Sequence, residues 1–516
     1  LQPAPGYMDA EYYYAQGMQL ARVAGFYEPF LWNYLDNPLG IPHPAFTYWM
    51  PLPALLAAAG MRLTGSLDFF SARLLFILLA GLLPPLTVYL THHLTQRRQD
   101  GWLAGGLAAL SGFYAIYLTN TEGFTLYMLL GIGYLMAAFD CKSTQTTDMP
   151  FLDKSLYLGL IAGLMHLTRA DGVLWLMAAV ALRLFQVLKS AIYHRSLDRK
   201  RLFLGAEIVA AVMLGYGVVM CPWYLRNLCT FGSLFPPGGT QTLWLTDYDQ
   251  MFRYPADSLN FTNWLAAGWP LHVQVRLDAL GMNLENALAV EGTVFLTPLI
   301  LLGLWRLREF ACVRFAGLMW LSLLAVMTVV FPFAGSRGGF IHSTAALQPL
   351  FWAAAPAGLD GFIKLGVRRR NWQAGQAWQV FASGILALMA ILSGSVFWMR
   401  VRGSQAGQNA WLESQTAAQQ VEQGLVAWGA HPDEIVMVNN PPGYFVATGR
   451  SAIVIPDGDA QMALAAARRY HSRYLVLEAN HVRGLDGLYQ APEDLPGLDY
   501  LGSVDTAQIF EFSEDS

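Results

Sequence analysis

The chain has 516 residues, of which 55% are hydrophobic and only 13% carry a charge, and its formal net charge is −4. Because soluble domains carry roughly 25% charged residues, this composition excludes an ordinary soluble protein and indicates an integral membrane protein. The weak negative charge argues against a general nucleic-acid binder. The cysteines lie at irregular spacing, which gives neither a metal motif nor a disulfide framework; they are Cys141, Cys221, Cys229 and Cys312.

Residues 1–68 precede the first long apolar segment and are rich in aromatic, proline and acidic residues. MDAEYYYAQGMQLARVAGF spaces its apolar residues as a helix does, and YWMPLPALLAAAGMRL contains a second short helical pattern. We expect both helices to lie in the membrane interface, where Tyr12, Tyr13 and Tyr14 would anchor the first one. As an alternative, YWMPLPALLAAAGMRL could be a complete span, but every later basic loop would then face outward.

A series of apolar segments follows, each approaching the roughly 20 residues that a transmembrane helix needs. These segments lie at 69–91, 102–118, 123–140, 155–169, 172–189, 203–221, 293–306, 313–331, 344–363 and 378–399. The sequence therefore predicts a mainly α-helical, polytopic transmembrane bundle of about ten spans over residues 69–402.

The loops between these segments alternate in composition. One set is basic and contains Arg97 and Arg98, Lys142, residues 189–201, Arg306 with Arg308 and Arg314, and Lys364 with residues 368–370. The other set is poor in lysine and rich in aromatic residues, glycine and proline. The positive-inside rule assigns the basic loops to the cytoplasm. Residues 1–68 and the segment after about 403 then lie outside the membrane.

Residues 403–516 have the pattern of a small soluble α/β domain. The runs EIVMVN, AIVIP, YLVLE and AQIFEF are strand-like, and DAQMALAAARRYH is helical, with Asp459 placed as its N-cap. The location of this domain outside the membrane favours a role in acceptor selection. NNPPGY at 439–444 has turn chemistry, which we interpret as an ordinary turn, with a ligand-binding loop as the alternative.

Unusual ionisable residues gather at the outer ends of the predicted spans, where a charge beside lipid is costly and often functional. The acids are Asp9, Glu11 and Glu122, and the cations are Arg169, Arg226, Arg337 and His342. Each acid taken alone also has a simpler explanation. Asp9 and Glu11 suit a solvated interfacial helix. Glu122 suits the first turn of a helix capped by Thr121 or Asn120.

The cations also have simpler explanations when each is taken alone. Arg169 could form a local ion pair with Asp171 across a tight turn. Arg226 could extend into the interface beside Trp223, and Arg337 could lie in a flexible glycine turn. Their shared position on the predicted outer face, together with the acids, is what indicates a site.

A carboxylate with several cations suits sugar transfer from a lipid-linked phosphate. Arginine binds phosphate oxygens in a bidentate way. Phosphate is already a good leaving group, so electrostatic stabilisation replaces a general acid. The acceptor hydroxyl still needs a carboxylate as general base. A glycosidase, in contrast, must protonate a poor leaving group and needs two working carboxylates.

YMDAEYYYAQ resembles the acidic first external loop of GT-C superfamily glycosyltransferases, especially the protein mannosyltransferases that use dolichyl-phosphate-mannose and the aminoarabinose transferases of glycosyltransferase family thirty-nine type. TNTEGFTLYMLLG is similar to their second acidic loop, LTRADGVLWL to a TRPDG pattern and PWYLRNLCTFGSLF to a PWxxRN pattern. The resemblance covers about residues 1–365. NPLGIPHP also resembles oligosaccharyltransferase catalytic subunits of the same superfamily.

This resemblance implies an undecaprenyl- or dolichyl-phosphate sugar donor, inversion at the anomeric carbon and a catalytic aspartate in the first external loop, which would be Asp9. Glu122 would serve the acceptor or a metal. The donor phosphate would be bound by Arg169, Arg226, Arg337 and His342. A divalent metal is the one cofactor that the resemblance raises, because oligosaccharyltransferases use one whereas the mannosyl and aminoarabinose relatives need none. The acceptor would be a protein, lipid or glycan.

Two features depart from the family pattern. Family members usually have a transmembrane helix before this loop, whereas the chain starts at Leu1 without a signal-like segment, so we expect that helix to be missing from the sequence. The acidic pair of the family is adjacent, whereas Ala10 separates Asp9 from Glu11. Residues two apart on a helix do not face alike, so we assign the base to Asp9 and expect Glu11 to shape the site.

Two other functions stay open at this point. A transporter or flippase of a lipid-linked saccharide would place polar residues near the bilayer midplane and often show inverted repeats. The predicted spans contain few ionisable residues, Glu207 being one candidate, and no repeat is visible. The other alternative is a catalytically silent membrane protein with the same fold.

Overall fold

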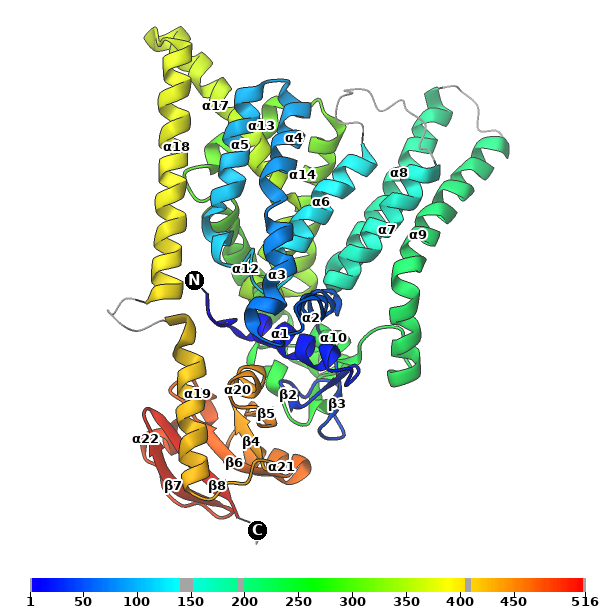
Figure 1. Cartoon of the computed structure of the whole chain (residues 1–516). Coiled ribbons are helices and arrows are strands. Elements are labelled where there is room, and N and C mark those ends of the chain that lie inside the picture. Colours follow the sequence, from blue (N-terminus) through cyan, green and yellow to red (C-terminus); the bar gives the residue numbers. More distant parts are fainter. Residues whose placement is uncertain (1, 140–151, 194–198, 404–409, 514–516) are drawn as a thin grey trace.

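The computed structural model describes residues 2–139, 152–193, 199–403 and 410–513 (Figure 1). Long helices form a bundle, and a mixed β-sheet built mostly from the C-terminal residues lies beyond one end of it. Helices α1 (Met8–Ala21) and α2 (Leu52–Thr64) lie at that end, between the bundle and the sheet (Figure 1). The predicted fold class, a helical membrane bundle with a C-terminal α/β region, is confirmed.

Helices occupy each of the ten apolar segments that the sequence predicts. Among the described residues, six helical runs are long and apolar enough to cross a membrane: Phe69–Thr95, Ala170–Ile192, Phe203–Phe231, Ala311–Val330, Pro332–Arg370 and Ala374–Arg402. The helices at the other segments are shorter, namely α5 (Arg98–Leu110), α6 (Phe124–Ala138), α7 (Leu152–Thr168) and α13 (Thr297–Arg306). The chain is a multi-pass membrane protein, and its number of spans and their orientation stay predictions.

One helix or several consecutive helices lie along each of these long runs. They comprise α3 (Phe69–Ala80), α4 (Leu83–Thr95), α8 (Val173–Tyr193), α9 (Arg199–Phe231), α14 (Ala311–Ala325), α15 (Pro332–Ala334), α16 (Phe340–Thr344), α17 (Gln348–Arg370) and α18 (Ala374–Phe397). The segment between α9 and α13 contains α10 (Pro237–Gln241), α11 (Phe261–Ala266) and α12 (Trp269–Asn286).

The chain is irregular just before α16. A π-helical turn at Gly335–Gly339 is kinked, with non-helical angles at Arg337 and Gly338. Gly338 has a φ of 108°, a conformation that side chains disfavour and glycine allows. Since π-turns are frequent at functional sites, this kink directs attention to Arg337 and to His342 one turn later.

The two N-terminal helices are packed inside the protein. Tyr12, Tyr13 and Tyr14 on α1 are 1%, 5% and 9% exposed. Tyr12 donates a 3.0 Å hydrogen bond to Glu28 Oε2, and Tyr14 donates one of 2.9 Å to the carbonyl of Leu67. The prediction of short helices is confirmed, but the expectation that the tyrosines anchor α1 at the membrane surface is wrong. The loop after α1, together with α2, covers them.

The C-terminal sheet has six strands in the order β2-β5-β4-β6-β8-β7. Strands β4 (Ile435–Val438), β5 (Ala452–Val454) and β6 (Ser472–Leu477) are parallel, whereas β8 (Ala507–Phe512) and β7 (Leu498–Val504) pair antiparallel. The helices of this region are α19 (Ala410–Ala427), α20 (Pro441–Thr448), α21 (Ala460–Tyr470) and α22 (Asp486–Gln490). Every predicted strand is present, and Asp459 caps α21 as predicted. Strand β7 is additional, since Asp499 and Gly502 interrupt its apolar pattern.

The sixth strand of this sheet comes from the N-terminal region. Strand β2 (Phe30–Leu31) pairs parallel with β5, and next to it β1 (Tyr27–Glu28) pairs antiparallel with β3 (His43–Pro44). Trp411 donates a 2.6 Å hydrogen bond from Nε1 to the carbonyl of Ala4, and Tyr470 donates one of 3.1 Å to the carbonyl of Pro38. Residues 1–68 and 403–516, which the sequence predicts as separate regions, therefore share a sheet.

The connection between α4 and α5 lies at the end of the bundle away from the sheet (Figure 1). Arg97 of this connection, with residues from two other predicted cytoplasmic loops, contacts Asp360 of α17. Its carboxylate lies 2.7 Å from Arg97 Nη1, 3.0 Å from Arg306 Nη2 and 2.8 Å from Lys364 Nζ. Three predicted basic loops thus meet at one carboxylate. Lys142 and residues 194–198, which belong to two other predicted basic loops, lie outside the described residues.

Candidate active site

Asp9, Glu122 and His342 form a compact cluster. Each offers one ligand atom, and these atoms all lie within 4.8 Å of one another. Glu122 Oε1 lies 2.9 Å from His342 Nδ1, and Tyr7 donates a 2.5 Å hydrogen bond to Glu122 Oε2. The three residues belong to the first turn of α1, the loop before α6 and helix α16. Their catalytic or binding roles stay predictions, but the fold brings them together from distant parts of the chain.

The loop that carries Glu122 is fastened to the N-terminal segment. Thr121 donates a 2.8 Å hydrogen bond to the carbonyl of Ala10, and Asn120 Nδ2 donates one of 2.8 Å to that of Pro5. Neither side chain caps α6, whose N-cap residue is Gly123 and has no side-chain cap. The simpler explanation of Glu122 as a capped first-turn acid is therefore wrong. Its side chain is 3% exposed and faces Tyr7 and His342.

Asp9 and Glu122 repel each other in a buried setting. Burial and the charge of Glu122 raise the pKa of Asp9 from 3.8 to about 6, while His342 and Arg169 act in the opposite direction. Two neighbouring carboxylates raise each other's pKa, and a cation placed between them would relieve this repulsion. A solvated interfacial helix, the simpler explanation for Asp9, does not describe this environment.

The cluster has the composition of a divalent metal site. Carboxylate oxygens and an imidazole nitrogen suit Zn²⁺ and Mn²⁺. His342 stacks on Phe124 at a ring distance of 4.0 Å. Among the described residues its buried Nδ1 has no hydrogen bond of adequate geometry, although Glu122 lies at ion-pair distance. Atoms bound to one ion at about 2.1 Å are at most about 4.2 Å apart, so small side-chain movements would close this cluster around an ion.

Glu11, the fourth residue of this group in the sequence prediction, faces elsewhere. It is 4% exposed, and its Oε2 accepts a 2.7 Å hydrogen bond from Asn440 Nδ2 at the start of α20. Burial raises the pKa of Glu11 from 4.5 to about 7; the Asn440 bond lowers it and the charge of Asp9 raises it. The prediction of an ordinary turn at NNPPGY is wrong, because Asn440 is the N-cap of α20 and residues 441–444 form its first turn, with prolines in positions that a helix start tolerates. This helix start contacts the N-terminal helix.

Arg169 is close to the cluster and already has a partner. Its Nε lies 2.9 Å from Asp171 Oδ1, so the local ion pair that the sequence offered as an alternative exists. Its charge also acts on Asp9, Tyr13 and Tyr48. Arg169 therefore belongs electrostatically to the site, with part of its charge compensated by Asp171.

Arg226 is occupied by the N-terminal loop. Its Nη2 donates a 2.7 Å hydrogen bond to the carbonyl of Ala45, and the guanidinium lies 4.9 Å from the Trp223 ring centre. The aromatic neighbour agrees with the simpler sequence explanation. These contacts fix the loop after α1, so the structure does not bring Arg226 into the Asp9 cluster.

Arg337 lies on the kinked turn with its guanidinium 4.1 Å from the ring centre of Tyr248. Among the described residues it forms no ion pair with a carboxylate. The next residue, Gly338, is close to His342: a Cβ there would lie 3.8 Å from His342 Cδ2. Arg337 is thus a cation without an acidic partner beside an acidic cluster.

Several site residues were not identifiable from the sequence. Burial raises the pKa of the phenols of Tyr13, Tyr48 and Tyr248, and the charge of Asp9 raises each further. Tyr7 binds Glu122 directly. Tyr7 and Tyr13 lie within YMDAEYYYAQ, but the sequence does not indicate that either contacts the acids, and nothing in the residues next to Tyr48 or Tyr248 singles these two out. The fold alone shows that they border the acids.

The comparison with known proteins agrees on the fold. No protein-family model matches the chain, and no curated protein matches its sequence. Among solved structures, the Archaeoglobus fulgidus oligosaccharyltransferase in complex with Zn and sulfate is 15% identical, with a TM-score of 0.55 over 96% of this chain and 68% of that one. ArnT from Cupriavidus metallidurans in the apo state is 12% identical, with a TM-score of 0.50 over 98% of this chain and 93% of that one.

The chain shares its overall fold with these two structures. At these identities the likeness establishes the fold and leaves the family and the activity as proposals. It extends over both the helical bundle and the C-terminal region, since nearly the whole chain aligns in both comparisons.

Proposed function

We propose that the chain is an integral membrane glycosyltransferase that moves a sugar from a polyprenyl-phosphate donor to an acceptor hydroxyl on the outer face of the membrane. The observation that carries this proposal is the Asp9, Glu122 and His342 cluster, whose ligand atoms lie within 4.8 Å of one another. The cluster borders Arg337, which has no acidic partner in the part of the chain that the structure describes. The GT-C fold supports it.

In this reaction Asp9 accepts the proton of the acceptor hydroxyl as the hydroxyl oxygen attacks the anomeric carbon. The bond from that carbon to the phosphate oxygen breaks, and the polyprenyl phosphate leaves with the electron pair. Arg337 and Arg169 stabilise the charge that develops on the phosphate. A single displacement of this kind inverts the anomeric configuration, whereas retention needs an enzyme nucleophile on the opposite face.

Glu122 and His342, with one oxygen of Asp9, are the residues that would hold a divalent metal. When bound, such an ion would supply positive charge next to the donor phosphate. The similar Archaeoglobus fulgidus structure contains Zn and sulfate, a metal and a tetrahedral anion. Without a metal, Glu122 would orient the acceptor hydroxyl and His342 would donate a hydrogen bond to the phosphate.

Transport of a lipid-linked saccharide is the second candidate, and the placement of charges favours it less. Glu207, the ionisable residue that the sequence offered within a span, is exposed on α9. The acids cluster instead at the first turn of α1, a helix that lies at the end of the bundle next to the C-terminal sheet (Figure 1).

A reconstitution experiment distinguishes the two. We expect the purified protein in nanodiscs, given undecaprenyl-phosphate-linked pentoses and hexoses with cell-envelope membranes as acceptor, to release undecaprenyl phosphate from one donor. No release from any donor, combined with movement of intact donor between the leaflets of proteoliposomes, would contradict the transferase and support transport.

A further inference from the structure

Helix α20 of the C-terminal domain touches the first turn of α1 through a buried polar contact. Glu11 is 4% exposed, and its Oε2 accepts the 2.7 Å hydrogen bond from Asn440 Nδ2 across 429 residues of sequence. Residues two positions apart on an α-helix point about 200° apart. Glu11 therefore faces α20 while Asp9, on the same turn, faces Glu122 and His342.

The orientation of the Asn440 amide is fixed by its second contact. Its Oδ1 accepts a 3.1 Å hydrogen bond from the backbone N–H of Gly443, as the N-cap of α20. The acceptor end of the amide is thus used within α20, and the donor end points at Glu11. Gly443 allows the close approach, because a Cβ there would lie 2.6 Å from Glu11 Oε2.

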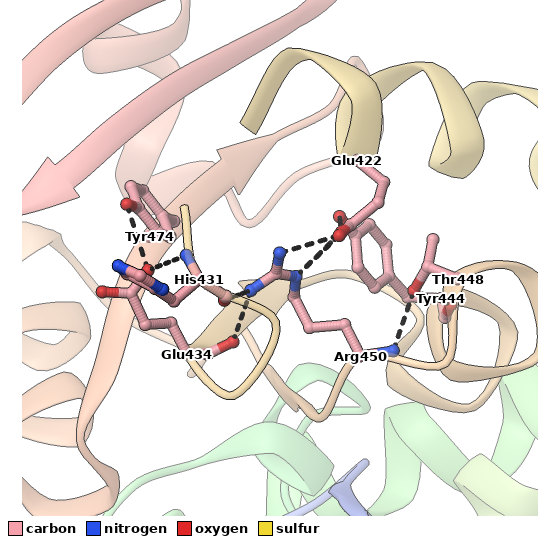
Figure 2. Close-up of polar contacts among 7 residues, drawn as sticks. All are labelled: Glu422, His431, Glu434, Tyr444, Thr448, Arg450 and Tyr474. Carbon is pink, nitrogen blue, oxygen red and sulfur yellow. Dashed lines mark hydrogen bonds and ion pairs between the residues drawn. The ribbon is translucent and has the colours of Figure 1, made fainter. Parts of the chain in front are cut away.

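Helix α20 is held rigidly from its other side (Figure 2). Tyr444 donates a 2.9 Å hydrogen bond to Glu422 Oε2, and Arg450, which is 3% exposed, binds both oxygens of Glu422 at 2.7 and 2.8 Å. The same guanidinium donates to the carbonyls of His431 and Glu434. A buried arginine with this many partners fixes the position of its neighbours. The network therefore fastens α20 to α19 and to the loop before β4.

We infer that Glu11 is a positioning residue through which helix α20 holds the first turn of α1, and with it Asp9, in its place beside Glu122. Glu11 is not part of the group whose ligand atoms lie within 4.8 Å of one another, and its contact is with the C-terminal domain. The inference deepens the proposed function and rests on it for its catalytic readout. It also gives the C-terminal domain a role in the site that does not depend on the acceptor.

The test exchanges the donor and acceptor of this hydrogen bond. Asn440→Asp keeps the N-cap oxygen but replaces the donor that faces Glu11 with a carboxylate oxygen, so the two side chains repel at a pH at which Glu11 is ionised. Glu11→Gln supplies an amide that can donate to the carboxylate introduced by Asn440→Asp. We expect Asn440→Asp to lower kcat for donor cleavage about tenfold in the wild-type background, a middle value for contacting pairs in double-mutant cycles. In the Glu11→Gln background we expect the same substitution to change kcat by less than about twofold.

The rescue shows that the two side chains act as a pair. A merely structural role would lower the amount of folded protein, whereas positioning lowers kcat per folded protein and leaves the KM for the donor unchanged. Asp459→Asn, a charge change at the N-cap of α21, is the matched control and should leave kcat unchanged. Equal loss of kcat from Asn440→Asp in both backgrounds would overturn the inference.

A second pair of variants avoids charge altogether. Gly443→Ala places a methyl group against Glu11, whereas Gly487→Ala in α22 places one in open space. We expect only Gly443→Ala to lower kcat and to speed hydrogen exchange of the α1 amides in the intact protein. Unchanged α1 exchange in both Gly443→Ala and Asn440→Asp would overturn the positioning role. If wild-type protein cleaves no donor, the proposed function fails, and the exchange measurement still decides the role of Glu11.

Discussion

Helix α1 and the connection between α4 and α5 lie at opposite ends of the helical bundle (Figure 1), and each belongs to a group of charged side chains of opposite design. At the α4–α5 connection a single carboxylate, Asp360, is bound by Arg97, Arg306 and Lys364 at 2.7 to 3.0 Å. At α1 two carboxylates, Asp9 and Glu122, share one histidine. Both groups join segments that are far apart in the chain.

The two groups differ in how far neighbouring side chains of opposite charge neutralise the carboxylates. Three cations surround the single carboxylate of Asp360, and these contacts hold α13 and α17 against the loop between α4 and α5. The Asp9 cluster sets two carboxylates against one histidine, and Arg169, whose charge also acts on Asp9, is itself paired with Asp171. Carboxylates whose pKa is raised in this way are common at functional sites. The difference supports the proposed function, in which the Asp360 group is structural and the Asp9 cluster carries the chemistry.

The largest effect short of removing the base should come from Glu122→Gln. The substitution keeps the shape of the side chain but removes the charge that faces His342 and would hold a metal. We expect donor cleavage to fall by about 10²-fold, a typical value for a lost electrostatic contribution. Glu285→Gln, on an exposed position of α12, is the control and should retain wild-type cleavage. Near-normal activity of Glu122→Gln would mean that the acid cluster, like the Asp360 group, has only a structural role.

Metal removal should have the next largest effect. We expect treatment with EDTA to lower donor cleavage at least about tenfold and Mn²⁺ or Zn²⁺ to restore it, because Asp9, Glu122 and His342 offer suitable ligands. His342→Ala should reduce the amount of metal bound per protein, measured by elemental analysis. Full activity with no bound metal would show that the reaction needs no metal ion, and the proposed role of Asp9 as general base would be unaffected.

The two arginines Arg337 and Arg226 should separate binding from folding. Arg337 has no acidic partner among the described residues, so Arg337→Ala should raise the KM for the donor about tenfold, as expected for loss of one charged contact to a phosphate. Arg226 instead binds the carbonyl of Ala45, so Arg226→Ala should lower the unfolding temperature more than it raises this KM. The opposite pattern would place Arg226 in the donor site.

The smallest effect on activity is expected at the compensated end. Asp360→Asn leaves three cations without their carboxylate and should cost about 1 kcal/mol of stability, because the group is partly exposed. Donor cleavage should stay within about twofold of wild type, within the roughly ±0.5 kcal/mol typical of changes away from a site. Thermal unfolding and donor cleavage, measured on one preparation, check both statements.

Much of the fold can be predicted from the sequence, because a membrane span requires a long run of apolar residues. Apolar segments of sufficient length predict helices, and helices occur at every predicted segment. In the C-terminal region, alternating apolar residues predict β4, β5, β6 and β8, and Asp459 predicts the start of α21. These features depend on local pattern, which a sequence states directly.

Features that depend on pairing between distant segments were not predictable. Strand β2 belongs to the C-terminal sheet, and the burial of Tyr12 and Tyr13 depends on a loop that follows them. For the site, the sequence predicts that Asp9, Glu122 and His342 share one side of the membrane but not that Glu11 turns toward Asn440. Helical spacing predicts that the side chains of Asp9 and Glu11 point to different sides of the helix, but only the fold shows what Glu11 contacts.

The most direct test of the central claim is the rate of polyprenyl-phosphate release by Asp9→Asn protein, with Asp68→Asn as control. Asp68 caps α3 and belongs to the same N-terminal region, and asparagine retains that cap. The account predicts that Asp9→Asn lowers the rate by about 10²- to 10⁴-fold, the range for loss of a general base, while Asp68→Asn does not lower it. Release by Asp9→Asn at the wild-type rate would contradict the account.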